Sequence, residues 1–184
     1  MTIYHDVIET RFGWMGLLRS EKGLMRTTLP QISPDRCIQI LGDEMAGAER
    51  SPERFIYLAR NLRRYFEGDK LRLVEETLDL EGATPFHRQA WQACMTIPFG
   101  ETRTYKWLAT QAGKPKAPRA AGQSMARNRL PIVVPCHRVI AADGGLRGFG
   151  AGATQLDLKQ SLLSMEADAS WAQPCMRQAK GGAA

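Results

Sequence analysis

The first eighty residues alternate short apolar stretches with turn-forming residues, a pattern typical of a small α/β unit. Residues 12–18 and 24–29 are apolar and flank turn formers at 21–23, which predicts a β-hairpin. Residues 30–50 contain two prolines and two glycines, so we expect irregular backbone there. Alternating leucines between residues 71 and 80 suggest a further strand. Nothing before residue 81 indicates a chemical role.

A helix is predicted from Ser51 to just before Gly68. Serine followed by proline is a favoured helix start, and glycine a favoured end. Apolar side chains recur between them at helical spacing, namely Phe55, Leu58, Leu62 and Phe66. Residues 81–83 (Glu-Gly-Ala) then form the expected boundary of an N-terminal α/β scaffold domain, residues 1–81.

The second half of the chain predicts several helices in a domain spanning residues 84–167. Thr84 followed by Pro85 begins one helix, whose face includes Cys94 as a core residue. Thr104 begins another, and Pro118 a third that runs to about residue 127. The last two, joined by a glycine-containing turn, form a candidate helix-turn-helix. A final helix carries Leu158, Leu162 and Met165 on one face, and we expect residues 168–184 to form a disordered tail.

The helix that begins at Pro118 has unusually short side chains. Small residues occupy five of its positions: Ala120, Ala121, Gly122, Ser124 and Ala126. Such side chains are too short to read bases in the major groove, whereas they allow the close approach that minor-groove binding requires. They equally allow close packing between helices, and the pattern alone leaves both interpretations open.

The segment at residues 131–140 carries the strongest chemical signal. Its β-branched residues 132–134 predict an extended buried strand, and Pro135 ends regular pairing just before Cys136. A lone cysteine is most often a small core residue, but His137 follows as a possible base, and a thiol needs a base or a positive neighbourhood to react. Adjacent side chains on a strand point to opposite faces, so we expect a water or a local bend to relay the proton.

A metal site is the other interpretation of a cysteine next to a histidine. The four cysteines are scattered, and neither a Cys-x-x-Cys pair nor a His pair at ligand spacing exists. We therefore expect no metal.

Charge is distributed unevenly along the chain. The net charge is +6, yet residues 85–149 hold ten Lys or Arg against two acidic residues, so the rest of the chain carries a slight negative charge. A basic segment inside a mildly acidic protein indicates a nucleic-acid-binding face.

The beginning of the chain lacks the basic end and apolar core of a signal peptide, and no apolar run is long enough to span a membrane. The expected location is cytoplasmic, with the four cysteines as reduced thiols.

Residues 135–140, Pro-Cys-His-Arg-Val-Ile, resemble the active-site motif of the O6-alkylguanine-DNA alkyltransferases, the methylated-DNA–protein-cysteine methyltransferases. Three other blocks are similar to that family in the same order: Phe-His-Arg-Gln-Ala-Trp at 86–91, Ile-Pro-Phe-Gly-Glu-Thr-Arg-Thr-Tyr at 97–105, and Pro-Arg-Ala-Ala-Gly at 118–122. The match covers about residues 84 to 167 and is loose before them.

This resemblance implies a ribonuclease-H-like N-terminal domain and a C-terminal winged helix-turn-helix domain. It implies a monomer that binds double-stranded DNA in the minor groove without sequence preference and flips out O6-alkylguanine, with O4-alkylthymine as a further substrate. The alkyl group passes irreversibly to Cys136, once per chain and without a cofactor. His137 is then the base that activates Cys136 through water and lowers its pKa, and Glu166 orients His137.

The resemblance also implies binding roles. Tyr105 pushes on the phosphate beside the lesion and hydrogen-bonds the departing guanine, and Arg119 fills the gap left by the base. Asn128 and Val139 line the base pocket, Val139 through its carbonyl. The full DNA-binding set is Arg119, Tyr105, Ala120, Gly122, Ser124 and Asn128, and the pocket set is Asn128, Val139 and Phe149.

The chain departs from the family pattern at Phe149, where many members have tyrosine, and at Arg129, where proline is frequent. The segment from Phe149 to Glu166 is also about three residues longer than usual. Two functions from other classes are alternatives to alkyl transfer. A lesion-binding protein that recruits other repair needs no acceptor cysteine, and a thiol hydrolase does not explain the basic segment.

Overall fold

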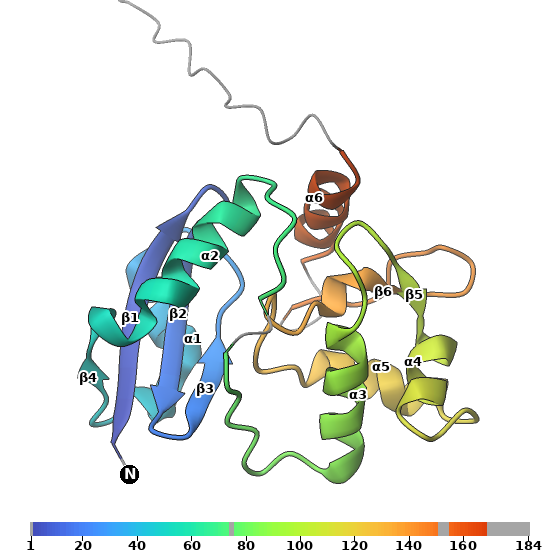
Figure 1. Ribbon diagram of the computed structural model, residues 1–184, viewed down its shortest axis with the longest axis horizontal. Coiled ribbons are helices and arrows are strands. Elements are labelled where there is room, and N and C mark those ends of the chain that lie inside the picture. Colours follow the sequence, from blue (N-terminus) through green and yellow to red (C-terminus); the bar gives the residue numbers. More distant parts are fainter. Residues whose placement is uncertain (1, 74–75, 151–154, 169–184) are drawn as a thin grey trace, which may run out of the picture.

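The computed structural model describes residues 2–73, 76–150 and 155–168. Its N-terminal half contains a four-stranded sheet in the order β3-β2-β1-β4 (Figure 1). The first three strands are antiparallel neighbours, and β4 pairs parallel with β1. The strands are β1 (Ile3–Thr10), β2 (Gly13–Ser20), β3 (Gly23–Thr27) and β4 (Glu49–Arg50). The predicted hairpin is thus confirmed as β2 and β3, whereas β1 was not predicted.

Helices cover this sheet on both faces, with α2 in front of it and α1 behind it in Figure 1. Four consecutive residues of β2, from Met15 to Leu18, are therefore all buried, which a strand with one solvated face does not show. The helical elements here are α1 (Pro34–Leu41), the 3₁₀ turns Gly42–Met45 and Pro52–Phe55, and α2 (Ile56–Phe66).

Two expectations for this half are wrong. Residues 30–50 are not irregular throughout, because Ser33 accepts a hydrogen bond from the Arg36 N–H and Pro34 then begins α1. Residues 71–80 form no strand among those described. Leu78 makes only an isolated bridge to Leu24, since the chain here runs along β3 as a connection.

The C-terminal half is mainly helical, as predicted. Thr84 and Thr104 cap their helices by accepting bonds from the N–H groups of His87 and Trp107, and Cys94 lies in the core. The elements are α3 (Pro85–Met95), β5 (Arg103–Thr104), α4 (Tyr105–Gln111), α5 (Pro118–Ala126), the 3₁₀ turn η3 (Cys136–Arg138), β6 (Val139–Ile140) and α6 (Leu156–Ala167), with β5 parallel to β6. Residues 169–184, the predicted tail, lie outside the described residues.

Residues 130–135 form a buried turn, so the predicted strand before Cys136 is wrong. The Val134 N–H donates to the Leu130 carbonyl at 2.8 Å, and Ile132 has a φ of 75°. This left-handed conformation is unfavourable for a β-branched residue. Every residue from Leu130 to Val139 is buried, so the β-branched composition reflects burial on all sides.

The two halves are joined at this turn. The N–H and hydroxyl of Thr27, at the end of β3, donate to the carbonyls of Arg129 and Pro131, each at 2.9 Å. The Arg129 guanidinium donates to the Glu81 carbonyl at 3.0 Å. Buried apolar side chains continue from one half into the other. The N-terminal half therefore supports the backbone that leads to Cys136.

Within the described residues, the helices are too short or too polar for any of them to cross a membrane.

Thr27→Val should lower the free energy of unfolding by about 1–2 kcal/mol, because it leaves the buried Pro131 carbonyl without its donor. Thr110→Val removes a hydroxyl that bonds only within its own exposed helix turn and should change stability by less than about 0.5 kcal/mol. Urea denaturation of both variants measures this. Equal free energies of unfolding for the two variants would show that the Thr27 contact adds no stability.

Candidate active site

The turn η3 presents Cys136 in a mostly buried position, 7% exposed. Asn128, just beyond α5, donates from its amide nitrogen to the Cys136 sulfur at 3.1 Å and to the Val134 carbonyl at 2.9 Å. Its amide oxygen accepts the Leu130 N–H at 2.9 Å. Asn128 therefore holds both the buried turn and the thiol.

His137, the next residue in the chain, is fully buried. Its Nε2 lies 2.8 Å from Glu166 Oε1, whereas its Nδ1 has no hydrogen-bond partner in the structure. Among the described residues no hydrogen bond joins the side chains of Cys136 and His137, although the thiol does bond the His137 backbone. The side chains are kept apart by a 3₁₀ turn and not by the extended backbone we predicted. One ring nitrogen is thus held by a carboxylate and the other is left free.

Glu166, on α6, accepts hydrogen bonds from four residues. The Arg138 guanidinium donates in a fork, Nε to Oε2 and Nη2 to Oε1, each at 2.9 Å. The Gly100 N–H lies 3.2 Å from Oε2, and the Tyr65 hydroxyl donates to Oε1 at 2.5 Å. Together with His137, these donors satisfy the carboxylate in a site from which water is largely removed. The segment from Phe149 to Glu166 is longer than is usual in the family, and Glu166 nevertheless lies beside His137.

The environment sets the protonation of all three groups. Burial alone favours a higher pKa for Glu166, but His137 and Arg138 hold the pKa of this carboxyl well below its usual range. Burial lowers the pKa of His137 against the pull of Glu166. Burial likewise raises the pKa of Cys136, although Asn128 and the nearby Lys159 charge oppose it. The net shift of the thiol pKa is therefore upward and not downward as expected, because desolvation outweighs the neighbours that lower it, the His137 backbone among them.

The resting site thus contains a neutral thiol and a neutral imidazole beside an ionised carboxylate. Such a pair does not store a thiolate. Its chemistry suits a proton transfer that accompanies attack by the sulfur, because Glu166 would stabilise the imidazolium that forms.

Lys159 is a buried cation that the sequence did not indicate. It is 1% exposed, and its Nζ donates to the Val139 carbonyl at 2.7 Å. Burial lowers the pKa of its ammonium group. Lys159 and Glu166 are seven residues apart, two helical turns, so both project from one face of α6. The Val139 carbonyl, which the family resemblance implies in base binding, thus already accepts a hydrogen bond from Lys159.

A cavity of about 570 Å³ opens beside the thiol, a size typical of small-ligand sites. Tyr105, Asn128, Cys136 and Phe149 are among its lining residues. Phe149 is buried and meets the His137 ring edge-on, with centroids 6.4 Å apart. The structure therefore brings the predicted thiol and most of the predicted pocket residues into one cavity.

The helix α5 has two different faces. Arg119 is exposed, and Ala120 and Gly122 are partly exposed. Ser124 is fully buried, and its carbonyl accepts the Trp91 indole N–H at 2.9 Å. Ser124 thus packs against α3 and is not available to DNA, which corrects its place among the predicted DNA contacts. Close packing between helices therefore explains the small residues on this face of α5, and not those on its exposed face.

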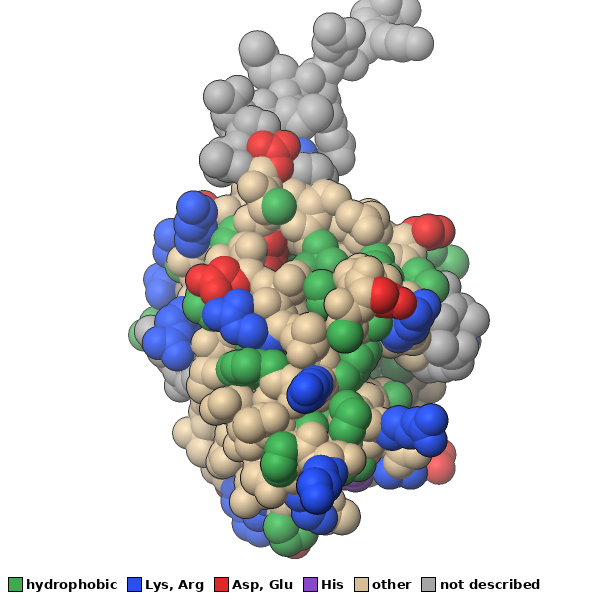
Figure 2. Space-filling model, turned by 90° about the vertical axis from the view of Figure 1, so that its right-hand side faces the viewer, with side chains coloured by type: hydrophobic (Ala, Val, Ile, Leu, Met, Phe, Trp, Pro, Cys, Tyr) green, Lys and Arg blue, Asp and Glu red, His purple; other side chains and the backbone are tan. Residues whose placement is uncertain are grey.

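Tyr105 begins α4 and packs on α5. A Cβ added at Gly122 would lie 3.7 Å from the Tyr105 ring, which is ordinary contact. Burial raises the pKa of the Tyr105 hydroxyl, so the group remains a proton donor. Figure 2 views the molecule from the side of α4 and β5, where Lys and Arg side chains stand among apolar ones.

Sequence reasoning missed three of the polar residues at this site: Tyr65, Arg138 in its paired role, and Lys159. Tyr65 comes from the other half of the chain, where no motif marks it. No group of three or more metal-ligating side chains occurs within residues 2–73, 76–150 and 155–168.

A family model described as the DNA-binding domain of 6-O-methylguanine DNA methyltransferase matches residues 85–168. The methylated-DNA–protein-cysteine methyltransferase of Methanosarcina barkeri is 41% identical over 164 residues, 89% of this chain and 97% of the relative. The relative from Mycolicibacterium paratuberculosis is 46% identical over 120 residues, 65% of this chain and 70% of the relative.

Solved structures agree. An O6-methylguanine methyltransferase variant of Mycobacterium tuberculosis has a TM-score of 0.75 at 32% identity, covering 94% of this chain and 96% of that one. The M. tuberculosis OGT in complex with DNA has a TM-score of 0.73 at 34% identity, covering 89% and 92%. The chain belongs to the methylated-DNA–protein-cysteine methyltransferase family.

Glu166→Gln should lower the free energy of unfolding at pH 7 by about 3–5 kcal/mol, because Arg138 remains buried without its counter-charge. The folded pKa of Glu166 lies below its unfolded value of about 4.3, so its stabilising effect is complete above that pH and is lost as pH falls through the folded pKa. The difference in free energy of unfolding between wild type and Glu166→Gln should therefore become smaller as the pH falls.

Urea denaturation between pH 3 and 7 measures this. Glu101→Gln, which breaks an exposed ion pair with Arg103, is the control and should differ from wild type by less than about 1 kcal/mol. A gap for Glu166→Gln that does not change with pH would contradict the expected ionisation.

Proposed function

We propose that this protein repairs DNA by transferring the alkyl group from O6-alkylguanine, and from O4-alkylthymine, to Cys136. The observation that carries this is the position of the Cys136 thiol in a cavity, with a free His137 nitrogen and the ionised Glu166 behind it. The matched relatives are named methylated-DNA–protein-cysteine methyltransferases.

The reaction needs one displacement. A water relays the thiol proton from Cys136 to Nδ1 of His137 while sulfur attacks the alkyl carbon. An S–C bond forms, the C–O6 bond breaks, and its electron pair stays on guanine. Guanine then takes up one proton from water, and the His137 imidazolium returns one proton to water, so that the protons balance. Glu166 stabilises the imidazolium. The products are a thioether on Cys136 and an unmodified guanine, and no step restores the thiol.

The pocket residues have corresponding roles. Tyr105, whose hydroxyl stays protonated, donates a hydrogen bond to the departing base. The Val139 carbonyl, which still has a lone pair beyond its bond to Lys159, accepts from the guanine. Asn128 and Phe149 form the walls, and Asn128 also donates to the sulfur as negative charge develops on it.

Binding to the DNA is proposed to use the minor groove without sequence preference. The exposed side of α5 carries short side chains that let the backbone approach, and Arg119 at its start fills the space of the flipped base. The protein acts in this scheme as a monomer. Its halves correspond to a ribonuclease-H-like scaffold and a winged helix-turn-helix domain.

The two other functions are less well supported. A lesion-binding protein without transfer gives no reason for Cys136 beside a base, and the relatives are named as transferases. A thiol hydrolase predicts turnover on small esters and gives no reason for the basic segment at residues 85–149.

Incubation with excess duplex DNA containing O6-methylguanine should add one methyl group per chain, on Cys136, and then stop. Cys136→Ser should show no transfer, because a neutral hydroxyl is a much poorer nucleophile, yet should still bind the DNA with an affinity that falls steeply with salt. Intact-protein and peptide mass spectrometry measure the transfer. Repeated turnover would overturn the single-use mechanism, and retained binding without transfer by wild type would favour a lesion sensor.

Arg119→Ala should slow transfer from duplex DNA by about tenfold or more, since base flipping costs a few kcal/mol that this side chain offsets. Reaction with free O6-benzylguanine should remain within about twofold, because no base is flipped. Arg36→Ala, an exposed arginine on α1, is the control for lost charge. Equal slowing on duplex and free base would place Arg119 in the pocket instead.

A further inference from the structure

Tyr65 brings the N-terminal half of the chain into the active site. It lies on α2, is fully buried, and its hydroxyl oxygen is 2.5 Å from Glu166 Oε1 and 3.2 Å from His137 Nε2. With the 2.8 Å contact between Nε2 and Oε1, the three atoms form a closed triangle. No step of the proposed transfer reaction uses this hydroxyl.

The protons of this triangle can be assigned from charge. Burial, followed by the neighbouring Glu166 charge, raises the pKa of Tyr65 well above its ordinary value, so the hydroxyl is protonated. Its proton points to Glu166, which is ionised and has no proton to give. The Tyr65 oxygen therefore turns its lone pairs toward its other two partners, Arg138 and His137. Both neighbours of Nε2 are thus acceptors.

Two acceptors around Nε2 require a proton on that nitrogen. The neutral imidazole then carries its lone pair on Nδ1, the buried atom without a partner in the structure. This is the tautomer in which His137 can receive the thiol proton. The Nδ1–H tautomer would leave lone pairs facing one another at Nε2 and a buried donor unsatisfied at Nδ1.

We propose that Tyr65 is a positioning residue for the alkyl transfer: its hydroxyl fixes the His137 tautomer and reduces the pull of Glu166 on the imidazole proton. This inference rests on the proposed function of Cys136. Because the bond to Glu166 is much the shorter of the two, losing the hydroxyl leaves a more strongly attracting carboxylate and so makes His137 easier to protonate.

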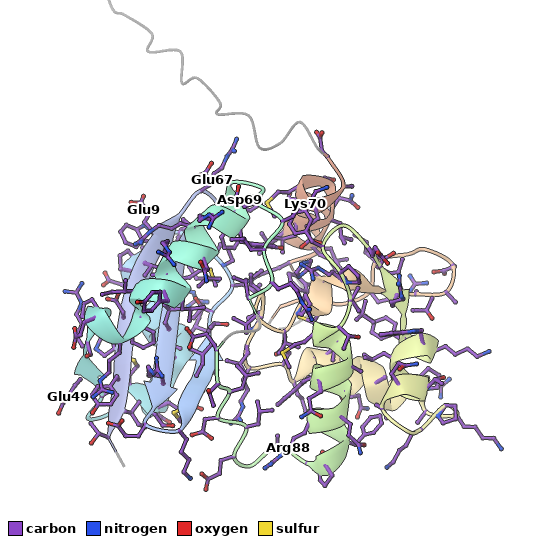
Figure 3. All side chains as sticks on the ribbon, in the orientation of Figure 1. Glu9, Glu49, Glu67, Asp69, Lys70 and Arg88 are labelled. Carbon is purple, nitrogen blue, oxygen red and sulfur yellow. The ribbon has the colours of Figure 1, made fainter. Side chains whose placement is uncertain are left out.

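The other ionisable groups near His137 are the same with and without the Tyr65 hydroxyl. Arg138 and Cys136 share the turn of His137, and Lys159 acts on it from α6. Charges further along α2 have partners elsewhere: Glu67 bonds Arg11 at 3.4 Å, and Arg64 bonds Asp69 at 2.7 Å. Glu67 and Asp69 lie at the outer end of α2 in Figure 3.

The test compares Tyr65→Phe with Tyr57→Phe, which removes a hydroxyl from an exposed side chain of the same helix. The imidazole of His137 is titrated by nitrogen-15 NMR, and alkylation by free O6-benzylguanine is followed across pH. Tyr65→Phe should move the His137 titration and the acid limb of the rate upward by about one pH unit, the size expected for one hydrogen bond to a charged group. The rate above that limb should stay within about threefold of wild type, and Tyr57→Phe should change neither.

A purely structural role for Tyr65 gives another result, namely a lower rate at every pH with both titrations unmoved, and this would overturn the proposal. A double-mutant cycle adds a second criterion. In a Glu166→Gln background, Tyr65→Phe should no longer shift the titration, and a persisting shift would also overturn it.

One measurement needs no variant. In the wild-type protein at neutral pH, the nitrogen-15 shifts of His137 should show a proton on Nε2, and a proton on Nδ1 would refute the assignment. The NMR titration is independent of transfer. If wild type is not alkylated at all, the proposed function fails, whereas normal alkylation with an unshifted His137 titration in Tyr65→Phe overturns only the role of Tyr65.

Discussion

The buried carboxylate of Glu166 is the group on which the rest of the site depends. Arg138 neutralises it with two hydrogen bonds of 2.9 Å, and Gly100, Tyr65 and His137 occupy its remaining acceptor positions. These donors come from three segments, namely α2, the loop after α3 and η3, and Glu166 itself lies on a fourth, α6. A charge removed from water has to be satisfied on all sides, so Glu166 requires these four segments to meet at one point.

In the proposed mechanism the thiol loses its proton during the attack, and no thiolate is held at rest. Burial disfavours charge on both Cys136 and His137, and a neutral thiol is less reactive toward electrophiles than a thiolate. The same burial strengthens the attraction between Glu166 and the imidazolium once it forms. Reactivity is therefore conditional on an alkyl carbon placed in line with the sulfur.

Local signals predicted the elements whose ends carry capping residues. Thr84–Pro85 and Thr104 marked α3 and α4, and Cys136 and His137 were marked by their motif. Ser33–Pro34 is the same kind of signal for α1, but the prolines and glycines around it favour irregular backbone. Tyr65 could not be found this way, because a tyrosine at helical spacing is indistinguishable from core until the partner helix is known. The contact with Glu166 spans 101 residues of sequence.

The turn at residues 130–135 shows why hydrophobic pattern misled at the site itself. Its β-branched residues are buried on all sides, so their composition matches that of a central strand. A strand would alternate its side chains and continue straight past Pro135. The observed turn instead places Ile132 at a φ of 75°, a conformation that costs energy for such a residue. Thr27 and Asn128 bond the carbonyls of this turn and its flanks, so tertiary contacts from both halves offset that cost, and the chain reverses where Cys136 enters the cavity.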